Sequence, residues 1–504
     1  MIDSYSEKQS KYLLILILVV VSGFKLAFTV LSPVSLFSEE TQYWLWSKHL
    51  DWNYYSKPLM IAVYNKIGTM FFGDTEIAVR FSAWIFTGLA AVLVFKLFLY
   101  MFGKPFYALM AAVMVLVMPF FHLASVFHTT DSSLVFFWIF TMYLAWKAIQ
   151  ESKTRYWIYA GLATFGGILS KNVMVLILPS IFLYLLITQP KLLLKRDFYL
   201  FSLVSSLSII PIVMWNFKND FVTFRHLGTL GGISGNGGFD WTAALRFSGE
   251  YLGGQMAVIS LFFLPLLILS IIRWAAYWEK ELLFLLMPAV LIWLMFIGVS
   301  LVKRVEVNWP AFSYVTLPIA MAYAVSVNER WKRYTYMAIG ISGLLLAGIM
   351  YPAPLDAIGF KKVLKPQKDP FFRMAGYREL GARVDFLLDS LEIGNHFVFS
   401  DSYHIAAELA FYMQGNPQTF NPNLGRRKNQ FDLWPGLDQF ENLDYAGVFV
   451  KRGKDDNELV NGAFQNLLYE ELNYGILRGE KVLTFKIQFF EAFKRLEELK
   501  IDAY

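Results

Sequence analysis

Long apolar runs separated by short polar segments occupy the chain from Tyr12 to about Tyr351. The hydrocarbon core of a bilayer is about 30 Å thick, and roughly 20 apolar residues in a helix span it. The pattern therefore predicts eleven membrane-spanning helices. Their approximate ranges are 12–34, 78–101, 106–122, 132–149, 156–170, 173–189, 198–216, 248–272, 282–302, 309–327 and 334–351.

The hydropathy falls after Tyr351, and charged, aromatic and aliphatic residues alternate from there on, as in a soluble mixed domain. The predicted fold class is therefore a polytopic α-helical membrane protein with a carboxy-terminal α/β domain. We expect residues 1–351 to form the transmembrane domain, with an outward loop at 35–77. Residues 352–504 form the expected soluble domain.

Composition supports this division and excludes several classes of function. The chain is 56% hydrophobic and 18% aromatic, which no ordinary soluble domain of 504 residues shows. The net charge is +6, but the basic residues form no single stripe of the kind that binds nucleic acid. Cysteine is absent, which excludes disulfides, thiolate metal sites and a cysteine nucleophile. Lys8 and Lys11 precede the first apolar run without a small-residue cleavage site, so we expect an uncleaved first helix.

The basic residues also predict the orientation. With a cytoplasmic amino terminus, most lysines and arginines between the helices fall on one side, as the positive-inside bias requires. These residues are Lys104, Lys147, Lys153, Arg155, Lys191, Lys195, Arg196, Arg273, Lys280, Arg330, Lys332 and Arg333. An odd number of helices then places the soluble domain on the outer side of the membrane.

Carboxylates on the outward side are the candidate catalytic groups. Glu39 and Glu40 are adjacent in the first outward loop, ahead of an aromatic stretch that includes Tyr43 and Tyr55. Acidic residues after Ser38 equally suit the first turn of a helix, where they favour the dipole. Asp131 begins an apolar helix, where a cap is the ordinary explanation. Two nearby carboxylates would instead bind a metal or divide base and charge-stabilising roles.

Cations on the same outward face complement these acids. Lysines near helix ends usually only snorkel to the interface. Five on the disfavoured face indicate an anion site, and a phosphate that joins a lipid to a sugar needs such donors. The predicted phosphate-binding residues are Lys57, Lys171, Arg225, Lys303 and Arg304.

Metal and nucleotide signals are weak. His128 and His226 belong to no i, i+4 histidine pair and no HExxH pattern, so a divalent metal is only an open alternative and no cofactor is assigned. The glycines between Gly228 and Gly238 follow no soluble strand and read as a mobile loop. Since no nucleotide fingerprint occurs elsewhere, a lipid-linked donor is favoured over a nucleotide-linked one.

Several motifs occur in order on the outward side. They are Glu39-Glu40-Thr41-Gln42-Tyr43-Trp44, Tyr55-Ser56-Lys57-Pro58, Thr130-Asp131-Ser132-Ser133-Leu134, Gly167-Ile168-Leu169-Ser170-Lys171, Trp215-Asn216, Phe224-Arg225-His226 and Glu306-Val307-Asn308-Trp309-Pro310. In this order they resemble the GT-C superfamily of membrane glycosyltransferases. The similarity is to bacterial relatives of the dolichyl-phosphate-mannose protein mannosyltransferases and of the lipid A aminoarabinose transferase. It extends more weakly to residues 400–403, 411–412 and 426–427.

The resemblance implies inverting transfer of a sugar from a polyprenyl phosphate, with an acid of the first loop as general base and lysine and arginine holding the leaving phosphate. Residues expected to line the substrates are Tyr43, Tyr55, His128, His226, Glu306 and Asn308. Two departures matter. The family's first acid is usually aspartate, whereas here it is Glu39, so either Glu39 or Glu40 fits the role of base. Ser56 stands where the aminoarabinose transferase has a glutamate that helps to hold zinc, which weakens the carry-over of a metal.

The function that follows is transfer from an undecaprenyl-type donor to a periplasmic acceptor such as lipid A or another glycolipid. Transfer to a protein hydroxyl is the alternative within the same class. A transporter of lipid-linked saccharides would show inverted repeats and polar breaks at mid-membrane, and the sequence contains no internal repeat.

Overall fold

The computed structural model describes residues 5–231 and 240–499. Part of the predicted glycine-rich loop, including Gly232, Gly235, Gly237 and Gly238, lies outside the described residues. The chain divides into two compact units, which are treated separately below. The first contains Met1–Leu26, Lys57–Ile61 and Arg80–Met350, and the second contains Ala27–Ser56, Ala62–Val79 and Tyr351–Tyr504.

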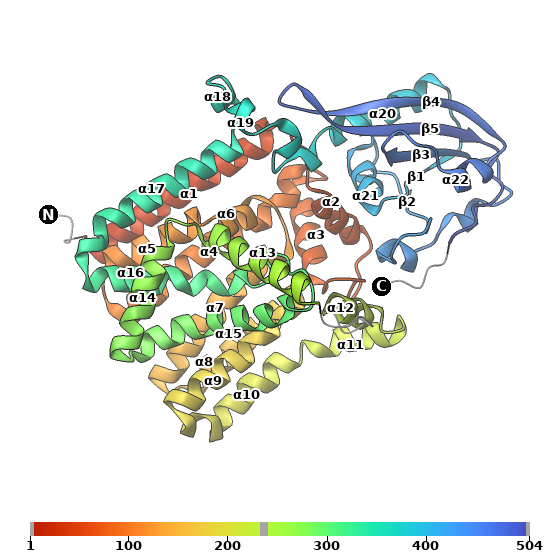
Figure 1. Cartoon of the computed structure of the whole chain (residues 1–504). Coiled ribbons are helices and arrows are strands. Elements are labelled where there is room, and N and C mark those ends of the chain that lie inside the picture. The colour runs from red at the N-terminus through yellow and green to blue at the C-terminus, as the bar shows by residue number, and fades with distance from the viewer. Residues whose placement is uncertain (1–4, 232–239, 500–504) are drawn as a thin grey trace. The chain divides into compact units, whose positions relative to one another are not determined.

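The amino-terminal part of the chain is helical throughout (Figure 1). Its α-helices are α1 (Glu7–Leu31), α2 (Ser38–Lys48), α3 (Met60–Phe72), α4 (Glu76–Phe102), α5 (Pro105–Val117), α6 (Pro119–Val126), α7 (Thr130–Glu151), α8 (Thr154–Ser170), α9 (Ile177–Thr188), α10 (Arg196–Ser206), α11 (Ile209–Lys218), α12 (Val222–Gly231), α13 (Trp241–Ile259), α14 (Leu264–Tyr277), α15 (Lys280–Ser300), α16 (Leu317–Val327) and α17 (Lys332–Met350).

Several of these helices are long and apolar enough to cross a membrane. Within the described residues, six helical stretches meet that criterion, and two bent pairs, α5 with α6 and α13 with α14, raise the number to eight. The stretches Asn172–Thr188 and Ala311–Val327 are apolar but shorter, and α8 has 17 residues. Each of the eleven predicted ranges overlaps one of these stretches. The protein is thus a multi-pass membrane protein, while the count of eleven stays a prediction.

A proline accounts for the first of the two bent pairs. Helix α5 ends at Val117, and Pro119 begins α6 after a 66° bend. A proline disfavours helical backbone in the residue before it and cannot donate to the preceding turn, so the helix breaks there. The second bend, of 98°, lies between α13 and α14, where Ser260 ends α13 with a φ of +79°.

One contiguous apolar core fills the first unit, with side chains from α4, α5, α7, α15 and α16. Small residues allow the closest helix contacts. A Cβ on Gly161 of α8 would lie 2.9 Å from the Val204 side chain and 3.0 Å from the carbonyl oxygen of Phe201, both on α10. The glycine is therefore what lets α8 and α10 approach.

The second unit contains a mixed sheet, as the change in pattern after Tyr351 predicts. Its strands are β1 (His396–Phe399), β2 (Thr419–Phe420), β3 (Ala446–Arg452), β4 (Asn466–Leu477) and β5 (Glu480–Glu491), and its helices are α18 (Ala353–Asp356), α19 (Phe360–Val363), α20 (Tyr377–Ser390), α21 (Tyr403–Tyr412) and α22 (Glu458–Gly462). The strand order is β2-β1-β3-β5-β4, with parallel pairing of β1 to β2 and β3 and antiparallel pairing of β5 to β3 and β4.

Alternation along the strands separates two cores. Val398 and Val448 point to the face covered by α20 and α21, whereas Phe397, Phe399 and Phe449 point to the face that α22 helps to cover. Successive strand side chains point to opposite faces, so one apolar run supplies both layers. The observed α/β fold confirms the predicted fold class of the soluble region.

Most of the first loop, residues 35–56 and 62–77, packs within this second unit. Helix α2 lies on α21 through a cluster that includes Leu36, Trp44 and Ala407. Polar contacts fix the same region, because the backbone N–H of Leu36 donates to the Tyr412 hydroxyl at 2.7 Å. That hydroxyl donates in turn to Glu76, 2.6 Å away. The loop is therefore held by carboxy-terminal residues more than 300 positions away.

Candidate active site

The two adjacent acids of the first loop have different environments. Glu40 is fully buried, and its Oε2 accepts a hydrogen bond of 2.9 Å from the backbone N–H of Phe37. This contact satisfies one of the donors that every helix start leaves unpaired. Glu40 thus stabilises the start of α2, which is the structural role that the sequence analysis gave as the alternative to catalysis.

Glu39 is half-buried and less engaged. Its carboxylate accepts one hydrogen bond, a long contact of 3.3 Å from the hydroxyl of Tyr43, one helical turn further along α2. A carboxylate with free lone pairs and some access to solvent can take a proton from a neighbouring molecule. Of the two acids, Glu39 is therefore the more accessible to a neighbouring molecule.

The aromatic residues of the loop are mainly buried anchors. Trp46 and Tyr54 are both fully buried and stack with ring centroids 4.5 Å apart. Tyr55 is also buried, and its backbone N–H donates to Oε1 of Gln430 at 2.8 Å. Only Trp52 of this group is strongly exposed, at 67%. Anchoring is therefore the better interpretation for most of these rings.

Asp131 is the centre of a second polar group, in the first unit. It occupies the first turn of α7, where Thr129 caps the helix and accepts from the backbone N–H of Asp131 at 3.3 Å. Lys171 donates to Oδ1 at 2.6 Å, and Asn308 donates to Oδ2 at 3.4 Å. The side chains of Asp131 and Lys171 are only 7% and 14% exposed. The structure therefore pairs two residues that the sequence assigned to separate roles.

His128 lies just before α7 and is completely buried. Its Nε2 lies 2.8 Å from the hydroxyl oxygen of Ser82. Burial lowers the pKa of His128 to about 3, because the low-dielectric surroundings disfavour the charged ring. The ring is accordingly neutral, so it can exchange a hydrogen bond but supplies no positive charge to a phosphate.

Several of the other predicted cations have partners in the chain. Lys303 donates to the carbonyl oxygen of Thr229 at 3.1 Å. Arg304 pairs with Glu250 at 3.3 Å on the surface, and their side chains are 69% and 48% exposed. Such an exposed pair is weak and opens readily. Lys303 is half-buried, which makes it the better placed of the two for an anion at a dry site.

The remaining predicted residues divide among three segments. Arg225 and His226 lie on α12, the former exposed and the latter half-buried. Glu306 is exposed in the turn that precedes Asn308. Lys57 is half-buried in the segment between α2 and α3. The prediction that the first-loop acids and Asp131 share one site concerns residues of different units and stays a prediction.

Sequence reasoning missed the residues that secure the loop from the carboxy-terminal side. Arg378 donates to both oxygens of Glu76 at 2.6 Å each, and also to the carbonyl oxygen of Ser32. Gln430 holds Tyr55. No local pattern marks these residues, because each partner is hundreds of positions away. A bidentate Arg–carboxylate pair is found only when the fold has brought both ends together.

The chain is similar in sequence and in fold to known membrane glycosyltransferases. Residues 56–215 match the family model of dolichyl-phosphate-mannose-protein mannosyltransferases. The lipid A galacturonosyltransferase RgtD of Rhizobium johnstonii is 25% identical over 411 residues, which cover 79% of this chain and 82% of that protein. The fold is that of the ArnT structure from Cupriavidus metallidurans bound to undecaprenyl phosphate, with a TM-score of 0.66, 14% identity and coverage of 95% and 97% of the two chains. These matches confirm the resemblance of the chain to the GT-C superfamily of membrane glycosyltransferases.

A shorter match agrees with this assignment. The undecaprenyl phosphate-α-4-amino-4-deoxy-L-arabinose arabinosyl transferase of Wigglesworthia glossinidia brevipalpis is 26% identical over 147 residues, 28% of this chain and 26% of that protein. The resemblance read from the motifs is thereby confirmed. So is the expectation that the chain is a glycosyltransferase.

This glycosyltransferase does not offer an evident metal site. Among residues 5–231 and 240–499, no group of three or more histidine or carboxylate side chains is arranged to hold an ion. Ser56 occupies the place of the glutamate expected to help hold zinc in the aminoarabinose transferase. Among the described residues, the donor set therefore does not fit zinc.

Proposed function

We propose that the protein transfers a sugar from an undecaprenyl-type polyprenyl phosphate to lipid A or a related glycolipid at the periplasmic face of a bacterial inner membrane. The observation that carries the proposal is the match to a lipid A galacturonosyltransferase over most of both chains. The neighbour of like fold is a protein described as bound to undecaprenyl phosphate. The proposed orientation, with the carboxy-terminal domain outside, rests on the distribution of lysine and arginine.

Glu39 is the proposed general base. It removes the proton of an acceptor hydroxyl while the acceptor oxygen attacks the anomeric carbon from the face opposite the phosphate. The bond from that carbon to the phosphate oxygen breaks, and the polyprenyl phosphate leaves with the bonding pair. The configuration is therefore inverted. Because phosphate is already a good leaving group, orientation and charge neutralisation supply most of the catalysis.

The remaining polar residues would manage the charge of the departing phosphate. Lys57, Lys171, Arg225 and Lys303 are the proposed donors, and the strong exposure of Arg304 makes it the weakest of the predicted set. Asp131 accepts from Lys171 and so fixes the position of its ammonium group. Its proposed task is to position that cation, because both its oxygens already have partners.

The test compares lipid A and total glycolipid, by mass spectrometry, from cells with and without the protein. We expect a sugar-sized mass that requires the protein and disappears with Glu39→Gln. Glu40→Gln is the matched control: it should lower the midpoint of thermal unfolding by weakening the start of α2, while retaining transfer in the folded fraction. Loss of transfer with a folded Glu40→Gln, and not with Glu39→Gln, would reverse the two roles.

The same cells distinguish the alternatives. Unchanged lipids together with a sugar-sized mass on periplasmic proteins would replace the glycolipid acceptor by a protein hydroxyl. The match to the family model of protein mannosyltransferases supports this second acceptor. Unchanged lipids and proteins, with lipid-linked sugar accumulating on one side of the membrane, would instead indicate transport.

A further inference from the structure

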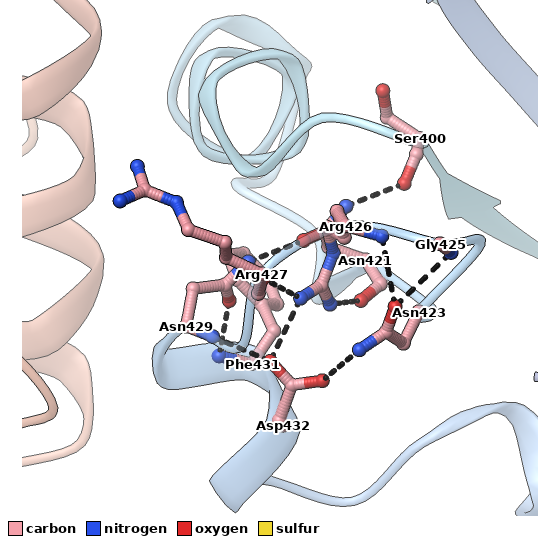
Figure 2. Close-up of polar contacts among 9 residues, drawn as sticks. All are labelled: Ser400, Asn421, Asn423, Gly425, Arg426, Arg427, Asn429, Phe431 and Asp432. Atoms are coloured by element: carbon pink, nitrogen blue, oxygen red, sulfur yellow. Dashed lines mark hydrogen bonds and ion pairs between the residues drawn. The ribbon is translucent and has the colours of Figure 1, made fainter. Parts of the chain in front are cut away.

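The loop formed by residues 421–432 is fixed by its own polar network (Figure 2). The carboxylate of Asp432 accepts from Nη1 of Arg426 at 2.8 Å and from the backbone N–H of Asn429 at 2.6 Å. The side-chain amide of Asn429 donates to Oδ1 of Asn421 at 2.8 Å. Asn421 donates onward to the carbonyl oxygen of Ser400, at the end of β1. These hydrogen bonds connect the loop internally and tie it to the end of β1.

Two adjacent arginines of this loop have opposite roles. The guanidinium of Arg426 is bound inside the network and also donates to the carbonyl oxygen of Asn421. Figure 2 shows the side chain of Arg427 extending away from all these groups. Arg427 is exposed, and throughout the described part of the chain its guanidinium makes no hydrogen bond or ion pair. The loop thus holds the backbone of Arg427 still while leaving its charge available.

The loop also rests on the first-loop helix. Gln430, three residues after Arg427, accepts from the backbone of Tyr55. Phe431 packs in the same apolar cluster as Trp44 and Leu45 of α2. The loop that carries Arg427 therefore lies against the helix that carries Glu39, within the second unit.

Tyr403, at the start of α21, lies within the electrostatic influence of both charged residues. Its ring packs against the cluster that joins α2 to α21, and its hydroxyl makes no hydrogen bond to any described residue. Burial raises the pKa of Tyr403 to about 12, with the charge of Glu39 acting in the same direction and that of Arg427 opposing it. Both charges therefore act on one neutral hydroxyl. Glu39, Tyr403 and Arg427 form a group whose bonding capacity is largely unused.

We propose that Arg427 and Tyr403 bind a phosphate of the acceptor headgroup and so position its hydroxyl for Glu39. The inference rests on the proposed function, because it takes Glu39 as the group that deprotonates the acceptor. A guanidinium forms two parallel hydrogen bonds to a phosphate, and the Tyr403 hydroxyl adds a neutral donor. A phosphorylated saccharide headgroup is the substrate class that this arrangement fits.

The test measures binding to the full-length protein in lipid nanodiscs by intrinsic tryptophan fluorescence. The probes are phosphorylated lipid A, the same lipid after enzymatic removal of its phosphates, and undecaprenyl phosphate. Removing a charge-assisted hydrogen-bond donor should raise the Kd for phosphorylated lipid A about tenfold or more in Arg427→Gln. The Kd for the dephosphorylated lipid should not change, Arg427→Lys should recover part of the loss, and Tyr403→Phe should show a smaller effect. Arg495→Gln, at an exposed arginine of the same unit, is the control.

Each outcome decides the matter. If no Kd changes in Arg427→Gln, or if the change is the same for the dephosphorylated lipid, the proposal is overturned. If the affinity for undecaprenyl phosphate falls instead, the anion belongs to the donor and the acceptor assignment is wrong. Unfolding midpoints equal to that of the parent protein establish that each variant is folded. Binding is measured without turnover. If Arg427→Gln loses the preference for the phosphorylated lipid but the parent protein transfers no sugar, only the proposed function is wrong.

Discussion

The ion pair between Lys171 and Asp131 gives the sharpest test of the first unit. Lys171→Met removes the ammonium and leaves Asp131 with the 3.4 Å contact from Asn308 as its remaining hydrogen bond to a described side chain. The side chains of the pair are 14% and 7% exposed. Removing one partner of a buried pair costs about 3–5 kcal/mol, because it strands a charge in a poorly solvated place. We expect the lower part of that range here.

A double-mutant cycle separates the pair from the individual side chains. Asp131→Asn with Lys171→Met removes both charges, so the double variant should be more stable than either single variant predicts. We expect a coupling energy of about 2 kcal/mol or more. Arg304→Met with Glu250→Gln is the control cycle, because that pair is 69% and 48% exposed. Its coupling should be about 1 kcal/mol or less.

The assay is reversible unfolding of the full chain in mixed micelles with increasing SDS, followed by circular dichroism. Turnover is measured on the same samples, and it should fall in both single variants because Asp131 positions Lys171. A coupling energy at Lys171 and Asp131 no larger than that of the control cycle would refute the reasoning.

Further expectations concern the second unit. Glu76→Gln removes the charge that Arg378 contacts through two donors at 2.6 Å, and it should lower the free energy of unfolding by about 1–3 kcal/mol, measured by the same titration. The hydrogen bond from Arg383 lowers the pKa of Glu471, so its stabilisation is present above the ordinary carboxyl pKa and is lost as pH falls through the lower folded value. Thermal melts from pH 6 to pH 3 should therefore be less acid-sensitive in Glu471→Gln; an unchanged pH dependence would contradict this. Gly376→Ala places a Cβ 2.4 Å from the backbone of Gly475 at a φ of +85°. It should lower the free energy of unfolding by about 2 kcal/mol or more. A melting midpoint equal to that of the parent protein would contradict this expectation.

Periodicity predicted much of the architecture because it reflects local physics. The first expected span, 12–34, overlaps α1 (Glu7–Leu31), and the shift to mixed patterning after Tyr351 coincides with the start of the α/β region. Apolar runs of bilayer length form helices because the backbone must satisfy its own hydrogen bonds in lipid. The number of spans did not follow as simply, since proline breaks and short helices blur a count made by length.

The candidate site was predicted only in part. The motifs picked out Asp131 and Lys171, but 40 residues separate them and nothing in the sequence shows that one holds the other. The sequence also did not show that the two adjacent acids differ in environment. Glu40 caps α2, whereas Glu39 remains accessible. Arg427 drew attention only as part of a weakly similar segment.

By itself, the sequence determined the class of protein: a multi-pass helical chain with a soluble α/β region and the ordered motifs of a membrane glycosyltransferase. Those properties depend on composition, periodicity and order along the chain. The tertiary structure decided which polar groups are already bound to one another and which remain available. That distinction depends on contacts such as Gln430 with Tyr55 and Arg378 with Glu76, each formed across 300 or more intervening residues. The sequence gives the charge of a side chain, but folding determines which group that side chain contacts.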